Sequence, residues 1–106
     1  MNAQFKRGIA ELLVMKVLKE GPLSSREVVR RLNVNVDINT NTIYPILRRL
    51  KENGYAEVEK VPSSFGAPRK FYRLTDKGHQ RFITYEREWK DFLSNALTIL
   101  GGTHHA

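Results

Sequence analysis

The hydrophobic pattern of this chain changes its period at Gly54, and that change limits the folds open to it. Before Gly54, apolar residues recur at spacings of three and four, as on the buried face of a helix. After it, apolar and acidic residues alternate over residues 56–59, as in a strand with one solvated face. The sequence therefore predicts a helical first half followed by strands.

Three helices are predicted before the change. The first covers residues 4–19, and a capping-box spacing at residues 24–27 begins a short second helix. The third begins within residues 39–41, where each residue is a good cap, and ends at Asn53. Gly54 then takes the left-handed position that commonly follows a helix.

A β-hairpin and a long helix are predicted after the change. The second strand covers residues 69–74, and a seven-residue loop rich in Pro and Ser, 62–68, joins it to the first. Thr75-Asp76 caps a last helix that runs to about Leu100. Three helices, a hairpin and a long helix predict a mainly α fold with a small β-hairpin, a winged helix-turn-helix.

The positive charge is confined to the first part of the chain. Lys and Arg total 18 against 11 Asp and Glu, a net charge of +7. Residues 1–74 hold 14 basic and 7 acidic side chains, whereas residues 75–106 hold four of each. This division favours a polyanion-binding body joined to a segment with another task. A merely solvated basic surface is the alternative.

The third helix of a winged helix enters the major groove of DNA. Asn pairs with adenine and Arg with guanine, while Thr and Tyr hydroxyls bind phosphate. The candidates on this helix are Asn39, Thr40, Asn41, Thr42, Tyr44, Arg48 and Arg49. Helix capping is the alternative role of Asn39 and Thr40. For Arg48 and Arg49 the alternative to base reading is phosphate contact or plain solvation.

The hairpin loop supplies a second set of DNA-binding candidates. Ser63 and Ser64 are small enough to let the backbone approach DNA, and Arg69 and Lys70 add positive charge beside them. A solvated turn is the alternative interpretation of this loop.

The last helix has the pattern of a dimer interface. Its apolar residues follow a heptad spacing over nearly three repeats, which indicates pairing with a second copy about a two-fold axis. The expected interface residues are Phe82, Tyr85, Trp89, Phe92, Leu93, Ala96 and Ile99. The alternative is a helix folded back on the chain's own core, although a helix of about 25 residues spans roughly 37 Å.

The sequence offers no support for catalysis. The absence of cysteine excludes disulfides, thiol nucleophiles and cysteine metal sites. His79 has no carboxylate or nucleophile at a telling spacing, and His104 and His105 belong to a tail beyond the last helix. Neither a Gly-rich phosphate loop nor a paired-acid site is visible. No enzyme activity, cofactor or metal is expected.

The N-terminal segment has part of the pattern of a secretory signal. Lys6 and Arg7 precede an apolar stretch over residues 9–18, but Glu11 and Lys16 interrupt it and no cleavage site follows. No other stretch approaches the ~20 apolar residues needed to cross a membrane. A cytoplasmic protein without a membrane partner is expected.

Two segments resemble the PadR family of transcriptional regulators. Residues 42–50 have the pattern T-x-Y-P-x-L-x-x-L, and residues 69–78 have R-K-x-Y-x-L-T-x-x-G. The resemblance covers about residues 8–100 and implies a winged-helix dimer. It places the region of Tyr44 at the DNA backbone and the last helix in the dimer interface. The chain length matches the short members, which have one C-terminal helix.

The resemblance also implies a role for Trp89. In the multidrug-sensing short members, a Trp of the last helix lines a pore at the dimer interface and stacks on flat aromatic ligands. Trp89 falls at the matching place, and packing within the heptad is its alternative role. The chain departs from the family pattern at Ser25-Arg26, where Gly-Tyr is usual, so the DNA contact of the second helix is open.

The function predicted is that of a sequence-specific DNA-binding regulator, a repressor that a small planar aromatic ligand relieves. Residues 1–74 are assigned to double-stranded DNA, 75–100 to a homodimer and 101–106 to a flexible tail. A protein-assembly module with an incidental basic surface and a non-specific architectural DNA-binding protein are the alternatives. The confinement of the excess charge to residues 1–74 favours the regulator.

Overall fold

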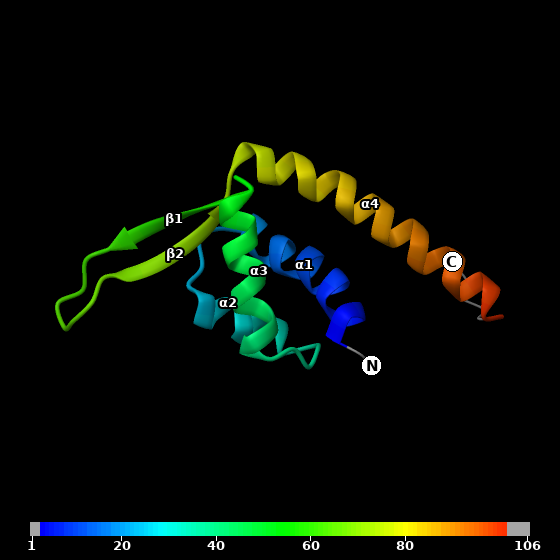
Figure 1. Cartoon of the computed structure of the whole chain (residues 1–106), viewed down its shortest axis with the longest axis horizontal. Helices are drawn as coiled ribbons and strands as arrows, with labels where there is room; N and C mark the ends of the chain where they lie inside the picture. Colours follow the sequence, from blue (N-terminus) through cyan, green and yellow to red (C-terminus); the bar gives the residue numbers. More distant parts are fainter. Residues whose placement is uncertain (1–2, 102–106) are drawn as a thin grey trace.

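The computed structural model describes residues 3–101 and has the predicted order of elements (Figure 1). The fold class, mainly α with one β-hairpin, is therefore confirmed. The predicted tail at 101–106 lies outside the described residues, apart from Gly101. The elements are α1 (Ala3–Lys19), α2 (Ser25–Leu32), α3 (Thr40–Glu52), β1 (Ala56–Val61), β2 (Arg69–Leu74) and α4 (Asp76–Ile99).

The predicted capping box is present at the start of α2. The Glu27 amide donates to Ser24 Oγ at 3.2 Å, and the Ser24 amide donates to Glu27 Oε1 at 3.0 Å. The Ser24 amide, and after it the Ser24 hydroxyl, hold the pKa of the Glu27 carboxyl below its ordinary value, because hydrogen bonds favour the charged form. These bonds fix the residue at which α2 begins.

Helix α3 begins as predicted and ends at Glu52, one residue before the predicted end, with Asn53 as its C-cap. Asn39 is its N-cap, with Oδ1 accepting from the Thr42 amide at 3.2 Å. Gly54 follows its end with a φ of 78°, a conformation that favours glycine. Pro45 lies just past the first turn, where its missing N–H deprives the Asn41 carbonyl of its usual intrahelical donor. The proline therefore removes one backbone hydrogen bond near the start of the helix.

Strands β1 and β2 form an antiparallel hairpin that projects from the helical body (Figure 1). Ala56 pairs with Leu74 at the base, where both are buried, whereas both strands are exposed toward the loop at 62–68. Two backbone hydrogen bonds between Leu23 and Tyr72, of 2.9 and 2.7 Å, join β2 to the α1–α2 connection. The hairpin is thus anchored at its base and solvated at its tip.

One hydrophobic core lies between the helices and the base of the hairpin. Phe82 of α4 belongs to it and is only 1% exposed, with the Nζ atoms of Lys16 and Lys19 at 5.9 and 5.4 Å from its ring centre. The prediction that Phe82 lies in a dimer interface is therefore wrong. The first turns of α4 pack against α1, so this part of the helix folds back onto the chain's own core. The inward residues predicted for α3 are all buried: Ile43, Ile46, Leu47 and Leu50.

The second half of α4 is different, because its apolar side chains are exposed. Phe92, Leu93 and Leu97 have 56%, 41% and 44% of their surface in solvent, and Ile99 and Leu100 have more. In Figure 1 this half extends past the body formed by α1, α2 and α3. Within residues 3–101, no helix combines the length and apolar character needed to span a membrane.

The start of α4 is tied to the end of α3. The Thr75 amide donates to the Tyr55 carbonyl at 3.0 Å, and the Thr75 hydroxyl donates to the Gly54 carbonyl at 2.6 Å. Lys77 Nζ donates to the Asn53 carbonyl at 3.0 Å. The long helix and the third helix therefore share one hydrogen-bonded joint.

Candidate nucleic-acid interface

One face of α3 is exposed along most of the helix. Thr40, Asn41, Tyr44 and Arg48 all lie in solvent, and Tyr44 keeps 49% of its surface exposed. The spacing of three or four residues places these side chains on the same side of the helix. Together they present hydroxyl, amide and guanidinium groups, which bind phosphates and base edges.

Three other residues predicted for this face are placed differently. The Asn39 amide oxygen is occupied by its capping hydrogen bond, and Thr42 is half-buried. Arg49 lies 3.7 Å from the carboxylate of Glu11 on α1, so its guanidinium is directed toward α1. Consecutive helical residues point about 100° apart, so only Arg48 of the two arginines lies on the exposed face.

Helix α2 adds two arginines that the sequence analysis did not include among the DNA-binding residues. Arg26 and Arg30 line a hollow of about 370 Å³ together with Val29, Thr40 and Tyr44. Both arginines are exposed, one helical turn apart. Their i, i+4 spacing indicated one shared helix face, but their place beside α3 depends on how α2 packs, which has no local signal in the sequence. We call Arg26, Arg30 and the exposed residues of α3 the α2–α3 face.

The α2–α3 face continues onto the hairpin. Lys51 of α3 and Tyr72 of β2 line a hollow of about 390 Å³, and Tyr72 is also one of the two residues that anchor the hairpin. Tyr72 therefore both anchors the hairpin and borders the α2–α3 face. The remaining lining residues are Thr40, Asn41, Tyr44, Pro45 and Arg48.

The hairpin carries its predicted cations in an arrangement that is costly without an anion. Arg69 and Lys70 are exposed, as is Ser64, whereas Ser63 is half-buried. Lys70 pairs in register with Lys60 across the two strands. Like charges directly opposite each other disfavour strand pairing, and a bound polyanion would relieve that repulsion.

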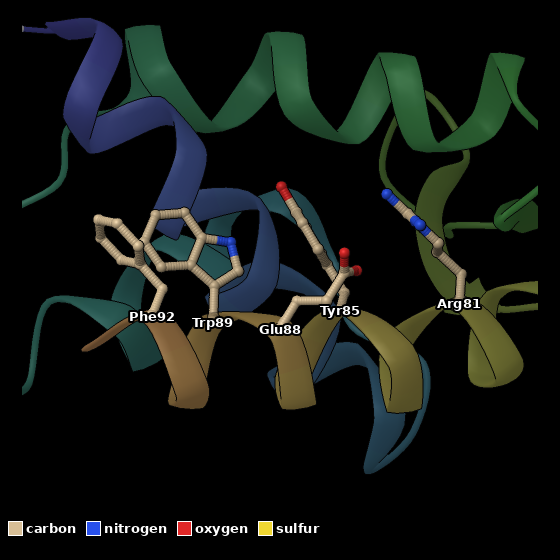
Figure 2. Close-up of a pocket in the computed structure, with 5 residues that line it drawn as sticks. All are labelled: Arg81, Tyr85, Glu88, Trp89 and Phe92. Carbon is tan, nitrogen blue, oxygen red and sulfur yellow. The ribbon is translucent and has the colours of Figure 1, made fainter. Parts of the chain in front are cut away.

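A separate hollow of about 280 Å³ lies on α4 and is lined by aromatic and charged side chains (Figure 2). Trp89 and Phe92 meet edge to face with ring centres 5.9 Å apart. The indole also packs against α1, where a β-carbon at Gly8 would stand 3.1 Å from the Trp89 ring. Trp89 is therefore held by the protomer on one side and open to the hollow on the other.

Tyr85, Arg81 and Glu88 complete this hollow. The Tyr85 hydroxyl donates to the Gly8 carbonyl at 3.4 Å, and the Arg81 guanidinium lies 4.8 Å from the Tyr85 ring centre. Glu88 adds a carboxylate to the same lining. The hollow thus offers flat aromatic surfaces with one cation and one anion. We call it the Trp89 hollow.

Metal-ligand side chains do not gather in the part of the chain that the structure describes. No group of three or more His, Cys, Asp or Glu side chains there is arranged to hold a metal ion. The chemical features of the described residues are therefore two surfaces, the α2–α3 face with the hairpin and the Trp89 hollow.

A polar third helix exposed beside a hairpin that is anchored in the core defines a winged-helix DNA-binding protein. Residues 14–83 match the model of the transcriptional regulator PadR-like family, which is more than half of the chain. The chain belongs to this PadR-like family, and it is a DNA-binding transcriptional regulator. The sequence resemblance to PadR regulators is thereby confirmed.

Solved structures of similar proteins have the same fold. A PadR-like transcription factor from Bacteroides fragilis is 31% identical, with a TM-score of 0.77 over 91% of this chain and 94% of its own. A PadR family transcriptional regulator from Eggerthella lenta is 30% identical, with a TM-score of 0.80 over 92% of this chain and 86% of its own. Bacillus subtilis PadR in complex with operator DNA is 22% identical, with a TM-score of 0.66 over 73% of this chain and 46% of its own.

Proposed function

We propose that this regulator is a sequence-specific repressor that binds operator DNA in the cytoplasm as a homodimer. The observation that carries the proposal is the continuity of the exposed α3 face with the arginines of α2 and with Tyr72 of the hairpin. A surface for protein assembly would not need hydroxyl, amide and cationic groups on one uninterrupted side. The Bacillus subtilis protein of the same fold, which was crystallised with operator DNA, supports this assignment.

The proposed contacts divide by chemistry. Asn41 has an exposed amide that can pair with the edge of an adenine in the major groove. Tyr44 and the two arginines of α2, Arg26 and Arg30, are suited to phosphates that flank the groove. Lys70 on the hairpin adds a further phosphate contact. Base reading is thus assigned to α3 and positioning to its neighbours.

We further propose that the second half of α4 forms the dimer interface. Leu93 and Leu97 are one helical turn apart and Phe92 is next to Leu93; burial of these exposed side chains against a second copy would remove them from water. A two-fold dimer presents two α3 helices to half-sites about 34 Å apart. The operator is therefore expected to be a symmetric or nearly symmetric sequence.

The Trp89 hollow is the proposed site of a planar aromatic effector. Its aromatic walls suit stacking on a planar ligand and cation–π attraction to a cationic one. Because the start of α4 is tied to the end of α3, a ligand that shifts α4 in the dimer would change the spacing of the two recognition helices. Loss of that spacing would release the operator.

The proposal is tested by selecting duplexes from a random library with the full chain and measuring affinity for the selected and for scrambled DNA. Asn41→Ala should weaken binding to the selected site about tenfold or more, the worth of one base contact, and leave scrambled DNA almost unaffected. Lys70→Ala should weaken both alike, because phosphates carry no sequence information. Fluorescence anisotropy with labelled duplexes measures both affinities.

Two outcomes would contradict the proposal. If no sequence is enriched, the chain is not a sequence-specific regulator. If Lys70→Ala relaxes the sequence preference while Asn41→Ala does not, α3 is not the element that reads the bases.

A further inference from the structure

The loop of the hairpin carries a phenylalanine that the protomer leaves in water. Phe65 is 97% exposed, the largest exposed fraction among the large hydrophobic side chains of the described residues. Single exposed apolar residues are common on protein surfaces, so exposure alone does not indicate a partner. The surroundings of Phe65 supply the further argument.

The hairpin around Phe65 is cationic. Residues 60–75 contain four basic side chains and no Asp or Glu. Arg73 pairs with Glu57 of β1 at 2.8 Å, which leaves Lys60, Arg69 and Lys70 toward the loop. Lys60 and Lys70 lie opposite each other in register, and the Arg69 guanidinium is 5.1 Å from the Phe71 ring centre. A surface of this charge repels a second copy of itself and attracts a polyanion, so the occupant that it favours is DNA.

The backbone beside Phe65 is suited to a close approach. Ser63, Ser64, Gly66 and Ala67 have small side chains or none. Ser63 Oγ accepts a hydrogen bond from the Phe65 amide at 3.3 Å, and Gly66 has a φ of 117°, which a side chain would strain. The turn is therefore built from residues that leave the ring as the only large group at the tip.

We propose that Phe65 is an apolar wedge that contacts the minor groove and pushes against a base step when the hairpin meets DNA. This inference rests on the DNA binding of the proposed function and adds a contact to it. Apolar side chains inserted between base pairs unstack them partly and bend the duplex. The lysines and arginine behind the ring would hold the phosphates on either side.

The wedge predicts a sequence preference at a position that no polar group reads. Pyrimidine–purine steps such as TA and CA are the easiest to unstack, so the step beneath the hairpin tip should be one of these. The selected operator should therefore carry a flexible step outside each region read by α3.

The test compares Phe65→Ala with Phe65→Leu on the selected operator, with 2-aminopurine placed at the candidate step. Phe65→Ala should bind the operator roughly tenfold more weakly, the size expected for one aromatic–base contact. The parent should raise the 2-aminopurine fluorescence by unstacking the step, and Phe65→Ala should lose this rise. Phe65→Leu keeps an apolar wedge and should retain most of both. Ile83→Ala removes an exposed apolar group of α4 and is the matched control, which should bind like the parent.

The results separate this inference from the proposed function. If Phe65→Ala binds as tightly as the parent and gives the same 2-aminopurine signal, the wedge is refuted while DNA binding stands. A change of oligomeric state in Phe65→Ala without DNA, measured by sedimentation, would refute it in favour of a contact between copies. If the parent binds no duplex, both proposals fail. Because the side chain is exposed, the melting temperature of Phe65→Ala should equal that of the parent.

Discussion

Gly78 shows how one residue sets the geometry of the joint between α3 and α4. A β-carbon at this position would overlap the carbonyl oxygen of Tyr55 and stand 3.2 Å from Leu74 Cδ2. The same Tyr55 carbonyl accepts the hydrogen bond of the Thr75 amide. The close approach of α4 to the turn after α3 therefore requires a residue without a side chain.

Gly78→Ala should destabilise the protein by roughly 1–3 kcal/mol, because the methyl group forces the backbone of the joint apart. Denaturant unfolding followed by circular dichroism measures the change. Gln80→Ala, on the exposed side of the same helix, is the control and should stay within about 0.5 kcal/mol of the parent. Equal stabilities of Gly78→Ala and the parent would show that the joint relaxes freely.

Single side chains were also where prediction from sequence failed. Helical spacing placed Ile43 and Leu50 in the core correctly, because burial of a stripe is a local property of the helix. It could not distinguish Arg48 from Arg49, since the Glu11 carboxylate that attracts Arg49 comes from another helix. The prediction that Phe82 lies in the dimer interface failed for the same reason, because α1 covers this side chain.

For helices and strands, the residues at which helices begin were predictable from the sequence, but the elements that pack against each other were not. Ser24 and Thr75 act on amides within three residues of themselves, so their capping could be inferred from spacing alone. The bridge between Leu23 and Tyr72 joins distant segments and has no local signal. The same limit hid the role of Arg26, whose place beside α3 depends on how α2 packs.

The first half of α4 packs against the chain's own core, and the second half is the proposed dimer interface. Trp89 lies between the two halves. A planar cationic dye should quench the fluorescence of this single Trp with saturation near one dye per dimer, because in the proposed dimer the two indoles would face each other across the two-fold axis. Stacking and cation–π attraction should contribute roughly 1–2 kcal/mol per ring. In Trp89→Ala, dye binding measured by the anisotropy of the dye should be lost while sedimentation still shows a dimer.

A charged substitution further along the helix is the control for this experiment. Leu97 is 44% exposed in the protomer, and Leu97→Glu should dissociate the dimer without unfolding the chain. If Trp89→Ala instead dissociates the dimer, and no dye quenches the parent, Trp89 is a packing residue and the Trp89 hollow is not an effector site.

At the scale of the whole molecule, the division of charge agrees with the division of surfaces. The excess of basic residues lies in residues 1–74, which form the α2–α3 face and the hairpin, while the neutral segment, residues 75–106, contains the whole of α4. Composition revealed this division because charges remain on the surface however the chain folds. The core does not follow it, since Phe82 joins α4 to the body.

The salt dependence of DNA affinity distinguishes a DNA-binding surface from a protein-binding one. A dimer that neutralises about 6–10 phosphates should lose on the order of a thousandfold in affinity or more between 50 and 200 mM salt, because binding releases condensed counterions. The measurement is a series of anisotropy titrations of the full chain with its selected duplex. An affinity that stays flat across this range would indicate that the basic surface serves a protein partner instead of DNA.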